Sequence, residues 1–106
     1  MPEPRVESPI TSAYAADEEM ADLVDLFVNE LPDRVAAFVS ALESDNWHEV
    51  QVISHQLKGA APGYGFDLVG EAAGQVEKLL LENASVDQRF DAAREFIALC
   101  GRVSKV

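Results

Sequence analysis

The clearest helical pattern in this chain lies in residues 46–66, which read NWHEVQVISHQLKGAAPGYGF. Apolar side chains recur there at three- and four-residue steps: Trp47, Val50, Ile53, Leu57, Ala60 or Ala61, and Tyr64. The stretch opens with Asn46, and Glu49 follows three residues later, which is the spacing of a capping box at a helix start. We therefore expect an amphipathic helix with one buried stripe.

Similar patterns lie on both sides of this stretch. They predict further helices over residues 17–31, 32–44, 67–80 and 85–103. Pro32 is expected to end the first of these helices and start the second, because proline suits the first turn of a helix and breaks its interior. Amphipathic helices of similar length with short connections predict an all-α fold, an antiparallel four-helix bundle with an additional N-terminal helix at one end.

The first sixteen residues show no sustained period. They contain Pro2, Pro4 and Pro9 among charged and small residues, which is typical of a flexible leader or linker. The predicted organisation is thus a leader over residues 1–16 and one helical domain over residues 17–106.

The length and charge of the chain limit the classes of function it can have. The chain has 106 residues, with 19 acidic and 8 basic side chains and a net charge of −11. A chain this short builds one small core, which argues against a large enclosed active site. Its acidity argues against nucleic acid and anionic membrane surfaces as partners.

The chain shows neither a signal peptide pattern nor an apolar run of about 20 residues, so we expect a cytoplasmic protein. Cys100 is the only cysteine. It lies at helical spacing from other apolar residues, and we interpret it as a small buried hydrophobe.

His55 is the candidate functional residue. It lies two positions, or about 200°, from both Ile53 and Leu57, so it is expected to point away from the buried stripe. The residues that share or border its face are Gln51, Val52, Gln56, Lys58, Gly59 and Pro62. An exposed histidine is most often a solvated residue without a function. Helix-breaking residues at positions 59, 62, 63 and 65 favour a functional interpretation, because they weaken the helix beside His55.

Residues 55–66, HQLKGAAPGYGF, resemble the signature of histidine-containing phosphotransfer (HPt) domains. That signature is a histidine, any residue, leucine, lysine, glycine, two small residues, and another glycine six residues after the first. The resemblance covers about residues 20–103 and implies a four-helix bundle with an exposed phosphorylated histidine. Pro62 departs from the usual pattern, and a local kink that leaves His55 in place is expected.

The resemblance implies a role for each residue of the motif. Neutral His55 would take a phosphoryl group from one aspartyl phosphate and yield it to another aspartate, with no kinase activity of its own. Lys58 would place its ammonium near the phosphoryl oxygens. Gly59 would let a partner approach closely, and Gly65 would permit close helix packing. The spacing also places Gln51 where it could hydrogen-bond the ring or the phosphoryl group.

The partner implied by the resemblance is the receiver domain of a response regulator. A hybrid sensor kinase is a further partner, in the same chain or another. The receiver would supply the magnesium ion, so no cofactor or metal is expected on this chain. The candidate docking surface comprises Gln51, Val52, Gln56 and Pro62, although burial of Val52 against other helices is an equally simple interpretation. A monomer is expected, because the partner needs the His55 face uncovered.

Two alternatives stay open: a helical docking or adaptor module that accepts no phosphate, and the phosphotransfer domain of a chemotaxis-type kinase. His48 lies two turns before His55. The rise between them is about 10.5 Å, too far for both rings to bind one metal ion. We interpret His48 as a surface residue.

Overall fold

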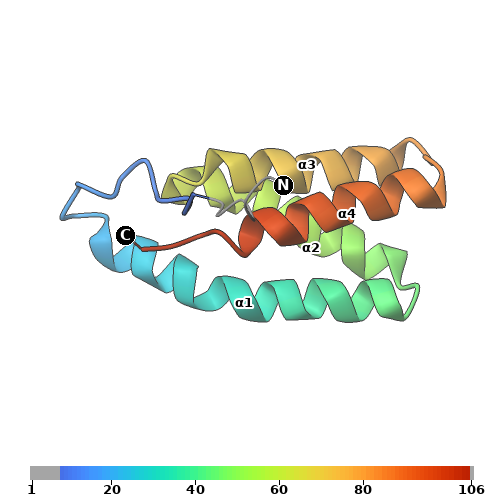
Figure 1. Ribbon diagram of the computed structural model, residues 1–106, viewed down its shortest axis with the longest axis horizontal. Coiled ribbons are helices and arrows are strands. Elements are labelled where there is room, and N and C mark those ends of the chain that lie inside the picture. The colour runs from blue at the N-terminus through green and yellow to red at the C-terminus, as the bar shows by residue number, and fades with distance from the viewer. Residues whose placement is uncertain (1–7, 106) are drawn as a thin grey trace, which may run out of the picture.

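The computed structural model describes residues 8–105, which form four α-helices and one short 3-10 helix. These are α1 (Ala21–Glu43), α2 (Trp47–Ala60), η1 (Ala61–Tyr64), α3 (Asp67–Leu81) and α4 (Val86–Cys100). Figure 1 shows α1 and α3 running one way across the bundle, while α2 and α4 run the other way. The prediction of an all-helical fold is confirmed. The described residues hold no strand, only an isolated β-bridge between Ile10 and Val103.

The first helix corrects one prediction. The two helices expected over residues 17–31 and 32–44 are one continuous helix, α1, with Pro32 inside it, so the described bundle has no separate N-terminal helix. Proline in a helix interior costs about 3 kcal/mol. The buried residues before and after Pro32 nevertheless belong to one stripe: Val24, Phe27, Leu31, Phe38, Ala41 and Leu42. Packing of this stripe outweighs the local cost, and Pro32 itself is exposed.

Side-chain caps mark two helix starts, and the first of them is the predicted start at Asn46. The Asn46 side chain accepts a hydrogen bond from the backbone N–H of Glu49 at 3.2 Å, at the start of α2. At the start of α4, Ser85 and Gln88 form a complete capping box. These caps satisfy backbone donors that have no partner inside the helix. They fix where the second and fourth helices begin.

Aromatic side chains hold the middle of the core. Phe38, Phe66 and Phe96 are fully buried, and the rings of Phe38 and Phe96 lie 4.8 Å apart between centroids. Cys100 is buried beside them, as predicted, and burial raises the pKa of its thiol to about 12. A thiol with this pKa stays protonated at neutral pH and is a poor nucleophile.

The segment before α1 differs from the predicted leader. Residues 1–7 lie outside the described residues, but the segment from residue 8 onward packs on the bundle. Ile10 is buried, and its backbone pairs with Arg102 and Ser104 at 2.8 and 2.9 Å. The buried Ser12 hydroxyl donates to the Tyr64 carbonyl at 2.6 Å. The apolar residues show no helical period here, because these contacts are made by a few residues in extended or turn conformation.

Gly65 also differs from its predicted role. It adopts a left-handed backbone conformation with φ of 86° and ends η1. A Cβ at this position would collide with Ser12 and would lie 2.7 Å from the backbone nitrogen of Ala13. The absent side chain therefore makes room for the N-terminal segment rather than for another helix.

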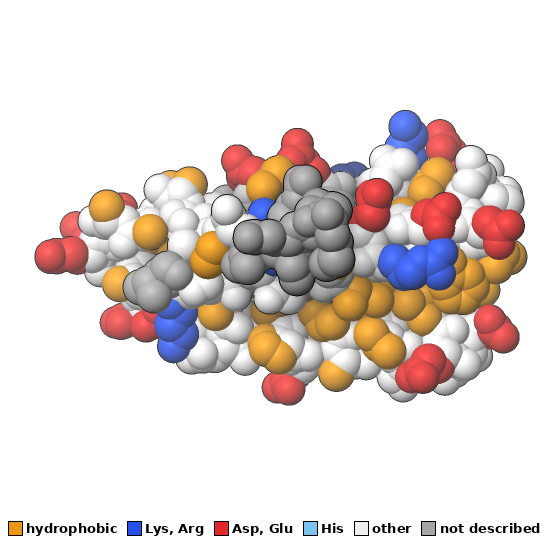
Figure 2. All heavy atoms as spheres, viewed as in Figure 1, with side chains coloured by type: hydrophobic (Ala, Val, Ile, Leu, Met, Phe, Trp, Pro, Cys, Tyr) orange, Lys and Arg blue, Asp and Glu red, His pale blue; other side chains and the backbone are white. Residues whose placement is uncertain are grey.

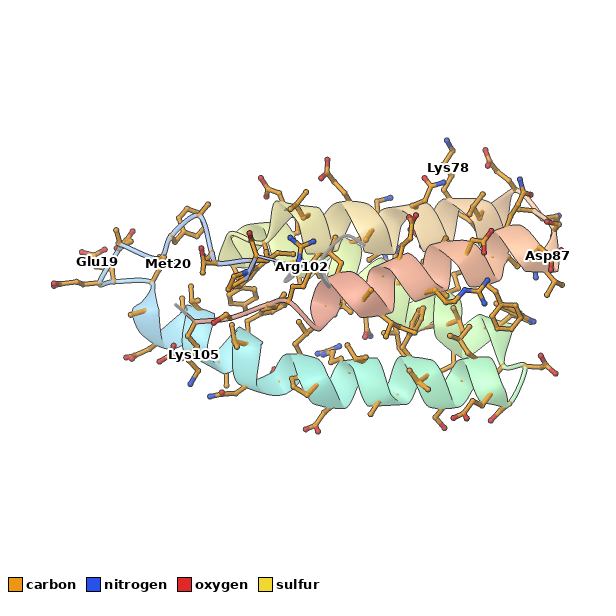
Figure 3. All side chains as sticks on the ribbon, viewed as in Figure 1. Glu19, Met20, Lys78, Asp87, Arg102 and Lys105 are labelled. Carbon is orange, nitrogen blue, oxygen red and sulfur yellow. The ribbon has the colours of Figure 1, made fainter. Side chains whose placement is uncertain are left out.

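Charged side chains cover the outside of the bundle. Lys78 on α3 and Asp87 on α4 point outward in Figure 3. Figure 2 shows hydrophobic side chains gathering along the seam between α1 and α4. None of the helices in residues 8–105 combines the length and apolar character needed to cross a bilayer.

Gly65→Ala is expected to lower the free energy of unfolding by about 2 kcal/mol or more, because alanine is strained at positive φ and its Cβ displaces the N-terminal segment. Urea unfolding measures this. Gly63→Ala is the matched control, since a Cβ there meets no atom within 4 Å. Equal stability of the two variants would contradict the assignment.

Candidate functional site

His55 lies in the middle of α2 with its side chain 72% exposed. Its neighbours Ile53, Ser54 and Leu57 are buried on the opposite side of the helix. The Ser54 hydroxyl donates to the Val50 carbonyl at 2.7 Å, so this buried polar group is satisfied within the helix. Packing of one side of α2 thus holds His55 at the surface, where the helical spacing places it.

A carboxylate from the next helix orients the imidazole. Glu77 of α3 places its Oε2 atom 2.9 Å from Nδ1 of His55, and the Glu77 side chain is only 7% exposed. An ionised carboxylate can only accept, so Nδ1 carries the hydrogen and donates it. In the neutral ring the lone pair then lies on Nε2, the other ring nitrogen.

Lys58 binds the same carboxylate. Its Nζ atom lies 3.5 Å from Oε1 of Glu77, and its side chain is 56% exposed. One buried carboxylate therefore links the histidine and the lysine, which lie one turn apart on α2. The ammonium offsets the cost of burying the Glu77 charge while remaining accessible to solvent.

Two glycines of α3 face α2. A Cβ on Gly70 would lie 2.8 Å from Cγ of Pro62, and one on Gly74 would touch Cδ of Lys58 at 3.4 Å. The bare backbone at Gly70 lets α3 approach Pro62 closely, whereas a Cβ at Gly74 would make only ordinary contact with the Lys58 stem. Pro62 is half-buried in this contact. The expected kink is a change of helix type, since α2 ends at Ala60 and η1 follows.

The surface on the open side of His55 is bare. Gly59 is exposed, and a Cβ there would meet no atom within 4 Å. A partner can therefore reach the imidazole past the helix backbone without meeting a side chain at this position. This geometry supports the predicted role of Gly59.

The predicted docking residues separate into two groups. Gln51, Val52 and Gln56 line a shallow hollow of about 360 Å³ together with His48, His55 and Glu77. Val52 is half-buried there. Its exposure thus lies between that of a docking residue and that of a residue packed against other helices, the two interpretations given for it. Pro62 lies apart from this hollow, packed against Gly70. The ring contact considered for Gln51 is made by Glu77 instead.

Glu77 is the site residue that sequence reasoning missed. It lies 22 residues after His55, so local spacing does not connect them. A signal exists nonetheless, because Ala73 and Val76 place Glu77 on the buried stripe of α3. A glutamate on an apolar stripe needs a partner, and that need points to the basic residues of α2.

Metal binding finds no support in the described part of the chain, where no three histidine, cysteine or acidic side chains are grouped to hold an ion.

Comparison with known protein families matches residues 22–105 to the Hpt domain, which covers most of the chain. The resemblance inferred from residues 55–66 is thereby confirmed. No curated protein and no solved structure matches the chain.

The Glu77 contact predicts the tautomer of His55. In ring-¹⁵N spectra above the histidine pKa range, we expect His55 in the form protonated at Nδ1, and Glu77→Leu to remove this bias. His48 is the internal reference, because its exposed ring makes no hydrogen bond within residues 8–105. A wild-type His55 spectrum identical to that of His48 would show that the contact does not persist in solution.

Proposed function

Because this chain belongs to the Hpt domain family, whose members serve histidine phosphotransfer in two-component signalling, we propose that it is a phosphorelay intermediate. His55 accepts a phosphoryl group from the aspartyl phosphate of one receiver domain and donates it to the aspartate of another. The chain is a phosphoryl carrier rather than a kinase. The observation that carries the proposal is the 2.9 Å contact between Nδ1 of the exposed His55 and the buried Glu77.

This contact prepares the nucleophile. The Nε2 lone pair attacks phosphorus, the N–P bond forms, and the O–P bond to the receiver aspartate breaks, so that the aspartate leaves as a carboxylate. The ring then carries a positive charge, because it keeps the hydrogen on Nδ1. The negative charge of Glu77 stabilises the charged ring through the same hydrogen bond. Donation to a second aspartate reverses these steps.

Lys58 acts on the negative charge of the phosphoryl group, as Glu77 acts on the positive charge of the ring. Phosphoryl transfer depends mainly on positioning and on stabilising charge on the phosphoryl oxygens. The exposed ammonium, 3.5 Å from Glu77 and one turn from His55, can turn toward those oxygens. Its contact with Glu77 holds it near the reaction when no phosphoryl group is present.

Partners follow from this chemistry. Domains of this family interact with receiver domains and with kinases, and we propose a receiver that supplies the acceptor aspartate and the Mg²⁺ ion. A hybrid sensor kinase, in the same chain or another, would supply the phosphoryl group upstream. We further propose that the domain acts as a cytoplasmic monomer, which leaves the bare backbone at Gly59 open to the partner.

The test is incubation with phosphorylated receiver domains, followed by assay for a phosphate that is labile in acid and stable in base. We expect label on wild type and on His48→Gln, and none on His55→Gln. The His48 variant is the matched control, because it removes an exposed histidine of the same helix face.

Label retained on His55→Gln would contradict the assignment of the phosphoacceptor. No label from any receiver, with label from an ATP-dependent kinase, would instead indicate the phosphotransfer domain of a chemotaxis-type kinase. No label from either donor would indicate an adaptor module.

A further inference from the structure

An apolar hollow lies between α1 and α4, on the side of the bundle away from His55. Its volume is about 460 Å³. The main neighbours of α2 are α1 and α3, so α4 lies diagonally across the bundle from the helix that holds His55. Uncharged residues line the hollow, among them Val28, Pro32, Val35 and Ala36 of α1 and Ile97 and Gly101 of α4.

The α1 side of this hollow belongs to a second apolar stripe of that helix, beside the stripe buried in the core. Val28, Pro32, Val35 and Val39 follow one another at steps of four, three and four residues. This is the spacing of the core positions of a coiled coil, which pack against a neighbouring helix. Pro32 is exposed and the other three residues are only half-buried. The contact with α4 therefore leaves part of the stripe uncovered.

The α4 side continues the apolar surface along the bundle. Ile97 is half-buried at the hollow, and Phe90, two turns earlier on α4, is half-buried as well. The ring of Phe90 meets the ring of Trp47 at 5.5 Å, at the start of α2. Figure 2 shows the hydrophobic side chains that gather along this seam between α1 and α4. Soluble proteins rarely expose a continuous apolar band unless it binds a partner.

Acidic side chains lie at both ends of the α1 stripe. Asp25 comes three residues before Val28, and Glu43 comes four residues after Val39, so both share the face of the stripe. Both are exposed. Neither forms an ion pair with a cation in residues 8–105. The apolar stripe thus has an uncompensated negative charge at each end.

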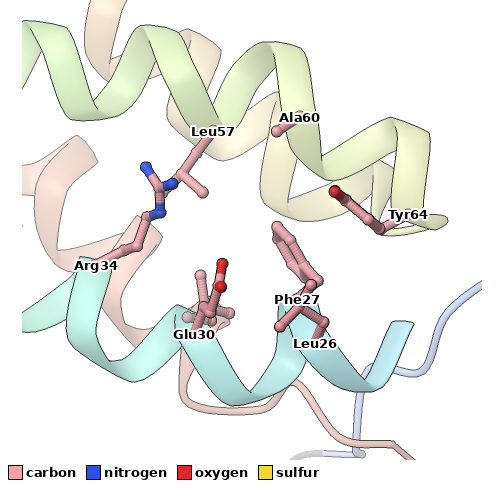
Figure 4. Close-up of a pocket in the computed structure, with 8 residues that line it drawn as sticks. Leu26, Phe27, Glu30, Arg34, Leu57, Ala60 and Tyr64 are labelled. Atoms are coloured by element: carbon pink, nitrogen blue, oxygen red, sulfur yellow. The ribbon is translucent and has the colours of Figure 1, made fainter. Parts of the chain in front are cut away.

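The basic side chains of α1 and α4 do not offset these charges, because they are engaged elsewhere. Arg34, the only basic residue of α1, points toward α2 in Figure 4 and donates a hydrogen bond to that helix at 2.9 Å. On α4, Arg89 lies over the ring of Trp47 at 5.2 Å. Arg94 of the same helix binds Asp91 at 2.6 Å. A partner that covers the stripe is therefore favoured if it carries positive charge.

We propose that the α1–α4 seam, the apolar band formed by Val28, Pro32, Val35 and Val39 with Ile97, binds a basic amphipathic helix of a partner protein. Apolar side chains of that helix enter the hollow, and lysine or arginine side chains at its two ends pair with the acidic residues that flank the stripe. The net charge of −11 attracts the same partner from a distance. This inference goes beyond the proposed function, and the seam lies opposite His55, so the bound helix leaves the phosphotransfer side open.

The test uses a synthetic amphipathic peptide of leucine and lysine about 18 residues long, which as a helix spans the roughly 27 Å from Asp25 to Glu43. Binding is measured by fluorescence anisotropy, and the contact is mapped by NMR. We expect saturable binding with shifts at the methyl groups of Val35 and Ile97 and none at His55. A peptide of the same composition in scrambled order, which has no apolar stripe, is expected to bind about tenfold more weakly or less.

Two adjacent alanines of α1 provide matched variants. Both are exposed, but Ala36 lines the hollow, whereas Ala37 points about 100° further round the helix. Ala36→Lys places bulk and positive charge in the hollow, and we expect it to raise the Kd for the peptide about tenfold or more. Ala37→Lys adds the same charge to the same helix and stays within about twofold of wild type.

A second comparison tests the flanking charges. Asp25→Asn combined with Glu43→Gln is expected to raise the Kd about fivefold at low salt, because both ends of the stripe lose their charge. Glu71→Gln combined with Glu82→Gln removes the same net charge at exposed positions of α3, diagonally across the bundle from α1, and changes the Kd less than about twofold.

Equal affinity of Ala36→Lys and Ala37→Lys would overturn the proposal, as would equal binding of the ordered and scrambled peptides. Peptide-induced shifts centred on His55 would place the peptide on the phosphotransfer side and would also overturn it. If Val35 and Ile97 shift with protein concentration alone and sedimentation shows a dimer, the seam is covered by a second copy of the chain, and the proposed partner is wrong.

Discussion

The carboxylate of Glu77 is the interaction on which the site depends. It lies almost completely buried between α2 and α3, 2.9 Å from His55 and 3.5 Å from Lys58. A buried carboxylate is costly without partners, and these two side chains offset that cost. The carboxylate can reach these two partners only if α2 and α3 lie close together. Gly70 on α3 has no side chain to collide with Pro62, and this allows the close approach of α3 to the end of α2.

This arrangement gives the two ring nitrogens of His55, the proposed phosphoacceptor, different surroundings. Nδ1 faces a fixed acceptor inside the protein, whereas Nε2 makes no such contact within residues 8–105 and belongs to a side chain that is 72% exposed. In the proposed reaction the bundle supplies orientation and charge, and the partner would supply the reacting aspartate and its metal ion. A small domain needs no enclosed cavity for a reaction divided in this way.

Much of the fold could be predicted from local sequence, because caps and helical spacing act over a few residues. Such spacing accounts for the Asn46 cap of α2, the Ser85 capping box of α4 and the outward direction of His55. Three features could not be predicted in this way, since they depend on contacts between distant segments. Packing of a continuous stripe carries α1 through Pro32, and Ser12 docks against Gly65. Glu77 likewise reaches His55 only once α3 has folded against α2.

The most direct test of this account is the position of the phosphoryl group on the ring. His55 labelled with ¹⁵N in the ring can be phosphorylated and examined for coupling between ³¹P and the ring nitrogens. The account predicts a bond to Nε2, because Nδ1 donates its hydrogen to Glu77. A bond to Nδ1 would contradict it, since that product requires the His55–Glu77 contact to break before transfer.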